Sequence, residues 1–156
     1  MPSRDSLPAT PDIPRSGRVL AIDWGTSRLG LAISDETQLL ATPLAVLRRR
    51  PGKRLPLRDF LTIVETEQPV GLVVGLPVDD AGQLGPAAAQ AREMGDLFAT
   101  RARLPLDWLD ESFTTTEAAH RLTERGIAPR LRRHDIDAIA AAVLLERWIA
   151  ERRGGA

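Results

Sequence analysis

The fold is decided by Val19-Leu20-Ala21-Ile22-Asp23-Trp24-Gly25 and the Leu29-Gly30-Leu31-Ala32-Ile33-Ser34 run that follows it. Four apolar residues precede Asp23 without an interruption, which is typical of a strand buried on both faces. Gly25 marks a turn, and the second apolar run predicts a strand that forms a hairpin with the first. We therefore expect a buried sheet that begins near Arg18.

The rest of the chain alternates between strand and helix patterns. Residues 39–47 predict a third strand, in which Pro43 argues for an edge position or a bulge. Two more strands are expected at 70–75 and 104–109, and the expected helices are 56–67, 86–101, 114–125 and 135–151. The apolar stripe of the 86–101 helix comprises Ala87, Ala91, Met94 and Phe98. This order predicts an α/β fold with a five-stranded mixed sheet: an antiparallel meander, then two parallel strands added through flanking helices.

The composition fits one domain of a protein without a membrane span. The chain has 156 residues, of which 43% are hydrophobic and 27% charged. We expect the domain to cover residues 18–152. Residues 1–17 contain four prolines and no apolar segment of a signal peptide, so they predict a disordered tail. The longest uncharged runs are too short to cross a bilayer, and a cytoplasmic location is the simplest interpretation.

Residue usage limits which metals the chain can bind. Cysteine is absent, and His120 and His134 are the two histidines, so thiolate and histidine-rich sites are excluded. A metal would have to be a hard cation held by carboxylate oxygens. Three acids fall where the predicted topology brings segments together: Asp23 ends the first strand, Glu111 follows the last strand, and Asp137 begins the final helix. Ligands of open α/β sheets gather at the carboxyl ends of the strands.

Each of these acids also has a purely structural interpretation. Asp23 fits a turn residue, Glu111 a solvated loop acid, and Asp137 a residue that stabilises a helix N-terminus. The spacing alone does not decide between these roles and a metal site.

Arginine dominates the basic residues, although the total charge is balanced at 21 basic and 21 acidic residues. The first basic cluster lies at 48–58, and the second lies at 121–133. Either cluster suits a phosphate backbone, and either also fits a solvated charged face. The second lies between Glu111 and Asp137 in the sequence, so we expect its loop to border the acids. No basic strand with interleaved aromatic residues is present, which favours recognition of shape and phosphate over base stacking.

Four ordered stretches resemble the motifs of one family. They are 23–35 (DWGTSRLGLAISD), 73–86 (VVGLPVDDAGQLGP), 110–118 (DESFTTTEA) and 136–146 (IDAIAAAVLLE). Together they resemble the YqgF-type family of the RNase H-like superfamily. Its members are described as Holliday junction resolvases or as nucleases that mature pre-16S ribosomal RNA. The resemblance covers about residues 18–150 and implies an RNase H-like domain.

The resemblance also implies specific roles for residues. The acidic triad of the family falls on Asp23, Glu111 and Asp137, which would be catalytic residues and ligands of Mg²⁺ or Mn²⁺. Ser112 departs from the family pattern, which has arginine there. His134 precedes Asp137 by three residues and is either an auxiliary residue of the site or a solvated histidine at the helix start. The expected substrate contacts are Arg28, Thr114, Arg125, Arg130, Arg132 and Arg133.

The expected function is therefore a divalent-metal-dependent nuclease acting on structured nucleic acid. Precursor 16S rRNA, processed at its 5′ end, is the favoured substrate, and branched DNA is the alternative. A catalytically inactive nucleic-acid-binding module and a nucleotide-binding ATPase are further alternatives. The protein could act as a monomer or as a homodimer, since symmetrical cutting of two strands favours two-fold symmetry.

Overall fold

The computed structural model describes residues 12–154, apart from Thr26, Pro51, Lys53, 79–82 and 112–132. The side chains of Glu111 and of residues 133–135 also lie outside the description. The predicted helix at 114–125 falls outside it, as do residues 1–11 of the predicted tail.

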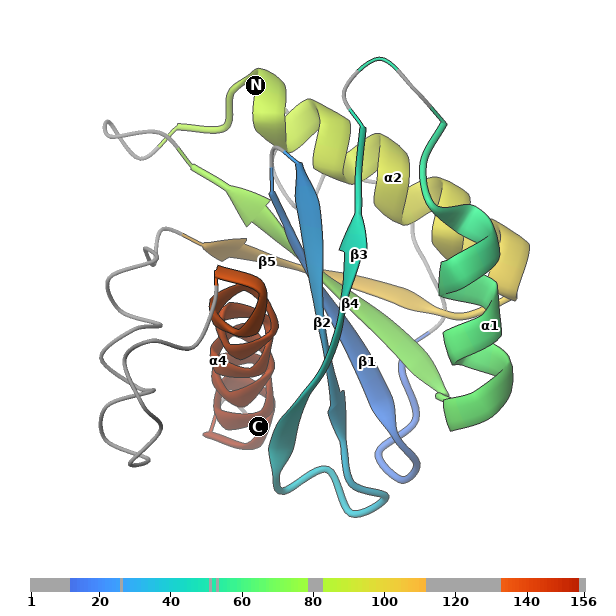
Figure 1. The fold of residues 1–156 in the computed structure, drawn as a ribbon. Helices are drawn as coiled ribbons and strands as arrows, with labels where there is room; N and C mark the ends of the chain where they lie inside the picture. The colour runs from blue at the N-terminus through green and yellow to red at the C-terminus, as the bar shows by residue number, and fades with distance from the viewer. Residues whose placement is uncertain are drawn as a thin grey trace.

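Within the described residues, five strands form one sheet in the order β3-β2-β1-β4-β5 (Figure 1). The strands are β1 (Val19–Trp24), β2 (Arg28–Ser34), β3 (Ala41–Arg48), β4 (Gly71–Pro77) and β5 (Leu106–Glu111). β1 pairs antiparallel with β2 and parallel with β4. β2 pairs antiparallel with β3, and β4 pairs parallel with β5. The predicted meander with two added parallel strands is confirmed.

Pro43 lies on the edge strand β3, and the pairing is also irregular there. Leu31 of β2 pairs with Ala45, but the next residue, Ala32, pairs with Pro43, so the register shifts between them. Proline cannot donate to a sheet ladder, and both an edge and a bulge remove that need. Both predictions for Pro43 are therefore confirmed.

Helices cover both faces of the sheet (Figure 1). α1 (Leu57–Glu67) and α2 (Pro86–Ala102) pack on one face, and α4 (Arg133–Gly154) packs on the other. β1 supplies both cores by alternation: Leu20 and Ile22 face α1 and α2, and Val19 and Ala21 face α4. These residues have no exposed surface, which explains why the strand reads as an uninterrupted apolar run.

The predicted stripe of α2 is wrong at one position. Ala87 is exposed, and Ala88 is buried in its place, along with Ala91, Met94 and Phe98. A residue one position away on a helix is rotated by about 100°, so Ala87 turns away from the sheet. Phe98 stacks on Phe60 of α1 with the ring centroids 4.2 Å apart, which joins the two helices.

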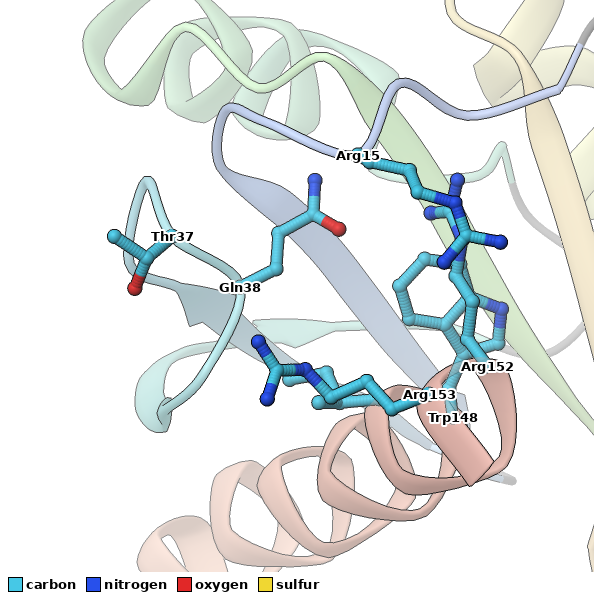
Figure 2. A pocket seen from close by; sticks show the side chains of 7 residues that line it. Arg15, Thr37, Gln38, Trp148, Arg152 and Arg153 are labelled. Carbon is cyan, nitrogen blue, oxygen red and sulfur yellow. The ribbon is translucent and has the colours of Figure 1, made fainter. Parts of the chain in front are cut away.

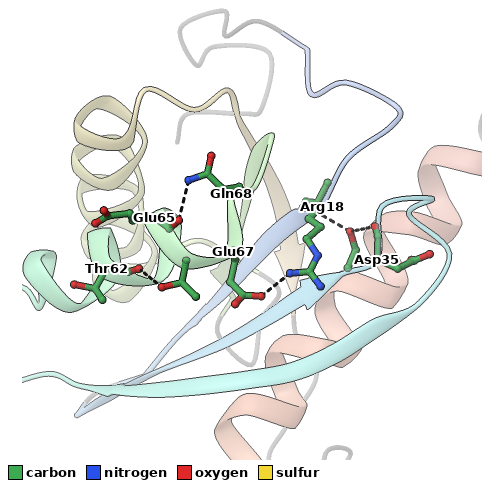
Figure 3. Close-up of polar contacts among 9 residues, drawn as sticks. Arg18, Asp35, Thr62, Glu65, Glu67 and Gln68 are labelled. Carbon is green, nitrogen blue, oxygen red and sulfur yellow. Dashed lines mark hydrogen bonds and ion pairs between the residues drawn. The ribbon is translucent and has the colours of Figure 1, made fainter.

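Residues 12–17 pack against the sheet, although the sequence places them in the tail. Ile13 is buried in the core beneath α4, and it lies over Gly71, where a Cβ would stand 2.6 Å from it. Arg18 Nη1 is 2.7 Å from Glu67 Oε1, an ion pair that joins the start of β1 to the end of α1 (Figure 3). None of the helices in the described ranges has the length and apolar character to cross a membrane.

Candidate active site

The carboxyl ends of β1, β4 and β5 meet at one edge of the sheet, because these strands are parallel. Asp23 is the penultimate residue of β1, and Glu111 is the last residue of β5. Glu111 pairs with Pro77 at the end of β4, so its backbone reaches this edge. Sequence reasoning therefore placed both residues on the correct edge of the sheet.

Asp23 and the backbone of Asp137 both adjoin Gly30 of β2. Asp23 is paired with Gly30 of β2, and directly opposed residues of an antiparallel pair point to the same face. A Cβ on Gly30 would stand 1.9 Å from the carbonyl oxygen of Asp137. The backbone of α4 thus rests on Gly30, on the face to which Asp23 points. Asp137 lies in the second turn of α4, because the helix begins two residues before its predicted start.

The positively charged side chain of Arg28 lies beside Asp137 at this edge of the sheet. Its Nε lies 2.6 Å from Oδ2 of Asp137, and the two side chains are 35% and 29% exposed. Both atoms are shielded from solvent, and neither has a conventionally oriented hydrogen bond to another described residue. The contact is therefore an ion pair of poor hydrogen-bond geometry. Sequence analysis assigned Arg28 to substrate, but in this structure it binds one of the candidate metal ligands.

The first two arginines of the first basic cluster lie beside the same edge. Arg28 pairs with Arg48 across β2 and β3, and Arg49 follows at once. The Arg49 guanidinium carbon lies 4.0 Å above the ring centroid of Trp24, and its Nη2 donates a hydrogen bond of 3.1 Å to Gln90 Oε1. Cation–π contacts of this kind hold the guanidinium in place.

From the sequence we expected the second basic cluster to border the acids, and we had no expectation of where the first cluster lies. The missed signal was the hairpin register: a meander returns the end of its third strand to the start of its second, beside the turn that follows Asp23.

Several predicted residues cannot be placed. Those outside the described residues are Ser112, Thr114, His120, Arg125, Arg130 and Arg132. Arg133 begins α4 and His134 follows it, but their side chains are not described. Among the side chains that are described, no three acids or histidines form a metal-binding group, and the side chain of Glu111 is not among them. The full triad therefore stays a prediction, with Asp23 and Asp137 on one face as its supported part.

Comparisons with known proteins agree on one family. Residues 17–151 match the family model described as RuvX, Holliday junction resolvase. A Roseiflexus protein provisionally assigned as a pre-16S rRNA nuclease is 36% identical over 137 residues, which cover 88% of this chain and 96% of that protein. A Mycobacterium ulcerans protein with the same assignment is 41% identical over 139 residues, which cover 88% and 81%.

Solved structures share the fold at lower identity. The structure of T. thermophilus RuvC in complex with a Holliday junction substrate superposes with a TM-score of 0.57 at 20% identity, covering 90% of this chain and 98% of that one. A second T. thermophilus RuvC structure also gives a TM-score of 0.57, at 19% identity, covering 88% and 96%. The likeness supports the predicted RNase H-like architecture.

Proposed function

The chain belongs to the RuvX family of Holliday junction resolvases, and on this premise we propose that it is a nuclease that cleaves phosphodiester bonds of structured nucleic acid with the help of divalent cations. We favour precursor 16S rRNA as the substrate, because relatives that match most of the chain carry that assignment. A ribosomal RNA precursor would place the protein in the cytoplasm.

The observation that carries the proposal is the convergence of Asp23 and Asp137 on Gly30. A binding module has no reason to place two carboxylates on one face beside a polyanion, because like charges repel the phosphates. A catalytic site that holds cations has such a reason, since the cations remove the repulsion.

The residues present fit Mg²⁺ or Mn²⁺. Carboxylate oxygens are the ligands that these hard cations prefer. The Arg28 guanidinium, 2.6 Å from Asp137, already places a positive charge beside this carboxylate. We propose that Asp23, Glu111 and Asp137 would hold the ions. When bound, these ions supply Lewis-acid chemistry, which activates water and stabilises the developing charge on the leaving oxygen.

The arginines of the first basic cluster would orient the substrate. Arg48 is exposed opposite Arg28, and Arg49 lies over Trp24, so both stand at the edge of the sheet where the acids lie. Guanidinium groups bind phosphate oxygens in a bidentate manner and remain charged at neutral pH. Arg28 would exchange its contact with Asp137 for a substrate phosphate. Arg125, Arg130, Arg132, Arg133 and Thr114 remain proposed contacts from the other side of the edge.

A cleavage assay tests this proposal directly. A precursor 16S rRNA fragment and a four-way DNA junction are incubated with Mg²⁺, Mn²⁺ or chelator, using wild type, Asp23→Asn and Asp137→Asn. We expect cleavage that needs the cation, and a loss of about 100-fold or more in each variant. Asp59→Asn is the matched control, because Asp59 is exposed in α1 on the opposite face of the sheet. Full activity of Asp137→Asn, or cleavage that persists in chelator, would contradict the assignment.

Branched DNA is the second candidate substrate, since the matching family model is described as a Holliday junction resolvase. Symmetrical cutting of a junction needs a two-fold dimer, whereas trimming of an RNA end does not. Sedimentation of the protein with each substrate therefore accompanies the assay. Binding of both substrates without cleavage under any cation would instead identify an inactive nucleic-acid-binding module.

A further inference from the structure

A second charged site lies at the far end of α4, away from the acids. It is a cavity of about 230 Å³ between the end of α4, the segment before β1 and the turn between β2 and β3. Figure 2 shows Arg15 reaching in from the segment before β1, with Arg152 and Arg153 coming from α4. Trp148 lies beneath the guanidinium of Arg152, and Gln38 closes the side formed by the turn. We call this site the arginine pocket.

The walls of the arginine pocket are held in place by contacts between separate parts of the chain. Gln38 is buried, and its Nε2 donates to the carbonyl oxygens of Pro14 at 2.8 Å and Gly17 at 2.9 Å. Arg152 donates to the carbonyl oxygen of Ile13, and its guanidinium carbon lies 4.7 Å from the Trp148 ring centroid. These bonds fix the turn, the segment before β1 and the helix end relative to one another, so the pocket is formed before any ligand arrives.

The side chains that line the pocket carry positive charge. Within the described residues, three arginines and no carboxylate line it. Arg152 Nη1 is shielded from solvent and has no hydrogen-bond partner there. Arg15 and Arg153 are both exposed, and no ion pair joins either to a described carboxylate.

The electrostatics of Arg152 agree with this picture. Burial lowers the pKa of Arg152, and the nearby positive charge of Arg15 lowers it further. Asp107 and Asp12 act in the opposite direction without cancelling these effects. Asp107 already accepts hydrogen bonds from Trp148 Nε1 and from the backbone N–H of Trp108, each at 2.8 Å. An anion between Arg15 and Arg152 would relieve their repulsion and give Nη1 a partner.

We propose that the arginine pocket binds a phosphate group. Convergent guanidinium groups match the tetrahedral oxygens of phosphate and can donate two hydrogen bonds each. Thr37 and Gln38 use their donors on the protein itself, so the arginines provide the recognition. Phosphate chemistry could reach the pocket from a nucleic-acid backbone or from a free phosphate or nucleotide.

The position of the pocket suits a nucleic-acid backbone, an assignment that rests on the proposed function. Arg152 follows Asp137 by fifteen residues on the same helix, which corresponds to about 22 Å at ~1.5 Å per residue. That span equals roughly six base pairs of duplex at ~3.4 Å per pair. A duplex along α4 would therefore place one phosphate in the pocket while another part of the backbone reaches the acids.

The test uses the double variant Arg15→Gln/Arg153→Gln, which changes exposed side chains and keeps the structural role of Arg152. The matched control is Arg101→Gln/Arg103→Gln, which removes the same charge from the exposed end of α2. The first arm measures the thermal midpoint with increasing inorganic phosphate. We expect phosphate to raise the midpoint of wild type and of the control but not of the pocket variant, because a ligand stabilises the state that binds it.

The second arm measures the binding of a fluorescent RNA duplex in chelator, where no cleavage occurs. We expect about tenfold weaker binding by the pocket variant than by the control, and a salt dependence reduced by the loss of about two phosphate contacts. If the pocket variant loses both the stabilisation by phosphate and the affinity for RNA, the pocket is a phosphate site that takes the nucleic-acid backbone. A loss of RNA affinity alone supports the same assignment. A loss of the stabilisation by phosphate alone supports the site and assigns it to free phosphate or nucleotide.

Equal behaviour of the pocket and control variants in both arms would overturn the proposal. Neither arm depends on catalysis, so a wild-type protein that cuts no substrate would overturn the proposed function and leave this test intact.

Discussion

Gly30 lies so close beneath Asp137 that a Cβ on the glycine would stand 1.9 Å from the carbonyl oxygen of the aspartate. No real Cβ approaches an oxygen at that distance, and the atom it meets belongs to the helix backbone, which cannot rotate away. The position of α4 on the sheet therefore depends on residue 30 having no side chain. The same contact fixes how closely the backbone at Asp137 approaches β2, on the face to which Asp23 points, because Asp23 is the strand partner of Gly30.

Gly30→Ala should destabilise the protein and impair the site together. We expect a loss of about 3 kcal/mol in the free energy of unfolding, at the upper end for overpacking, because α4 must lift off the sheet. Urea unfolding measures the loss. Gly154→Ala is the control, since a Cβ there meets nothing within 4 Å and should leave the stability almost unchanged. A Gly30→Ala variant of wild-type stability would mean that α4 does not rest on β2.

Arg28→Gln should strengthen cation binding while it weakens substrate binding. The guanidinium competes for Asp137 Oδ2, and this partly exposed ion pair is worth roughly 1 kcal/mol. Its removal should therefore raise the affinity for Mn²⁺ about fivefold, as measured by titration calorimetry on the protein alone. Arg28→Lys keeps the charge and should lie between the variant and wild type. An unchanged Mn²⁺ affinity in Arg28→Gln would separate Asp137 from the cation site.

Arg49→Gln should weaken substrate binding without changing the chemistry of cleavage. Arg49 stands over Trp24 at 4.0 Å, next to the strand end that carries Asp23. Loss of one phosphate contact should lower the slope of log affinity against log salt by about one. Fluorescence anisotropy at several salt concentrations measures this slope, and single-turnover cleavage at saturating protein should keep its rate. Arg101→Gln at the end of α2 is the control, and an equal slope in both variants would place Arg49 outside the interface.

The antiparallel meander with two added parallel strands, and the edge of the sheet that carries Asp23 and Glu111, could be predicted for physical reasons that are local or nearly so. Buried strands need apolar runs, and Pro43 cannot donate a hydrogen bond to a sheet ladder. Both features can therefore be recognised from the sequence alone. Asp23, Glu111 and Asp137 were expected to meet because ligands collect at strand ends, a rule that needs the topology alone, and the full triad stays a prediction.

What the sequence could not predict depends on contacts between distant segments. The ion pair between Arg28 and Asp137 requires α4 to pack directly on Gly30. No periodicity in the sequence predicts that contact. The arginine pocket joins Arg15, Gln38 and Arg152, and it exists because Gln38 ties the turn to the segment before β1. Ile13 was assigned to a tail because prolines surround it, whereas its burial depends on the space that Gly71 leaves open.

Asp35→Ala should remove part of the stability that the protein has at neutral pH, and the deficit should shrink in acid. Asp35 Oδ1 accepts the backbone N–H groups of Leu39 at 2.8 Å and Leu40 at 2.9 Å, and the side chain also accepts from Thr37. The hydrogen bond from Leu40, followed by that from Thr37, holds the pKa of Asp35 far below its usual value of 3.8. A lowered folded-state pKa means that the carboxylate stabilises the fold above the unfolded value near pH 4, and that this contribution disappears as the pH falls through the folded value.

Urea midpoints of wild type and Asp35→Ala should therefore differ at pH 7, and the difference should shrink below about pH 4 and vanish as the pH falls through the folded-state pKa. Convergence is expected because the wild-type carboxyl then binds the proton that the variant cannot bind. Glu93→Ala serves as the control, since Glu93 lies exposed in the middle of α2, remote from this turn. A midpoint difference that stays constant from pH 7 down to pH 2 would show that Asp35 acts through its shape in the turn between β2 and β3, and not through its charge. The turn also carries Gln38 into the arginine pocket, so loss of the Asp35 bonds should weaken the phosphate-induced rise in thermal midpoint at pH 7.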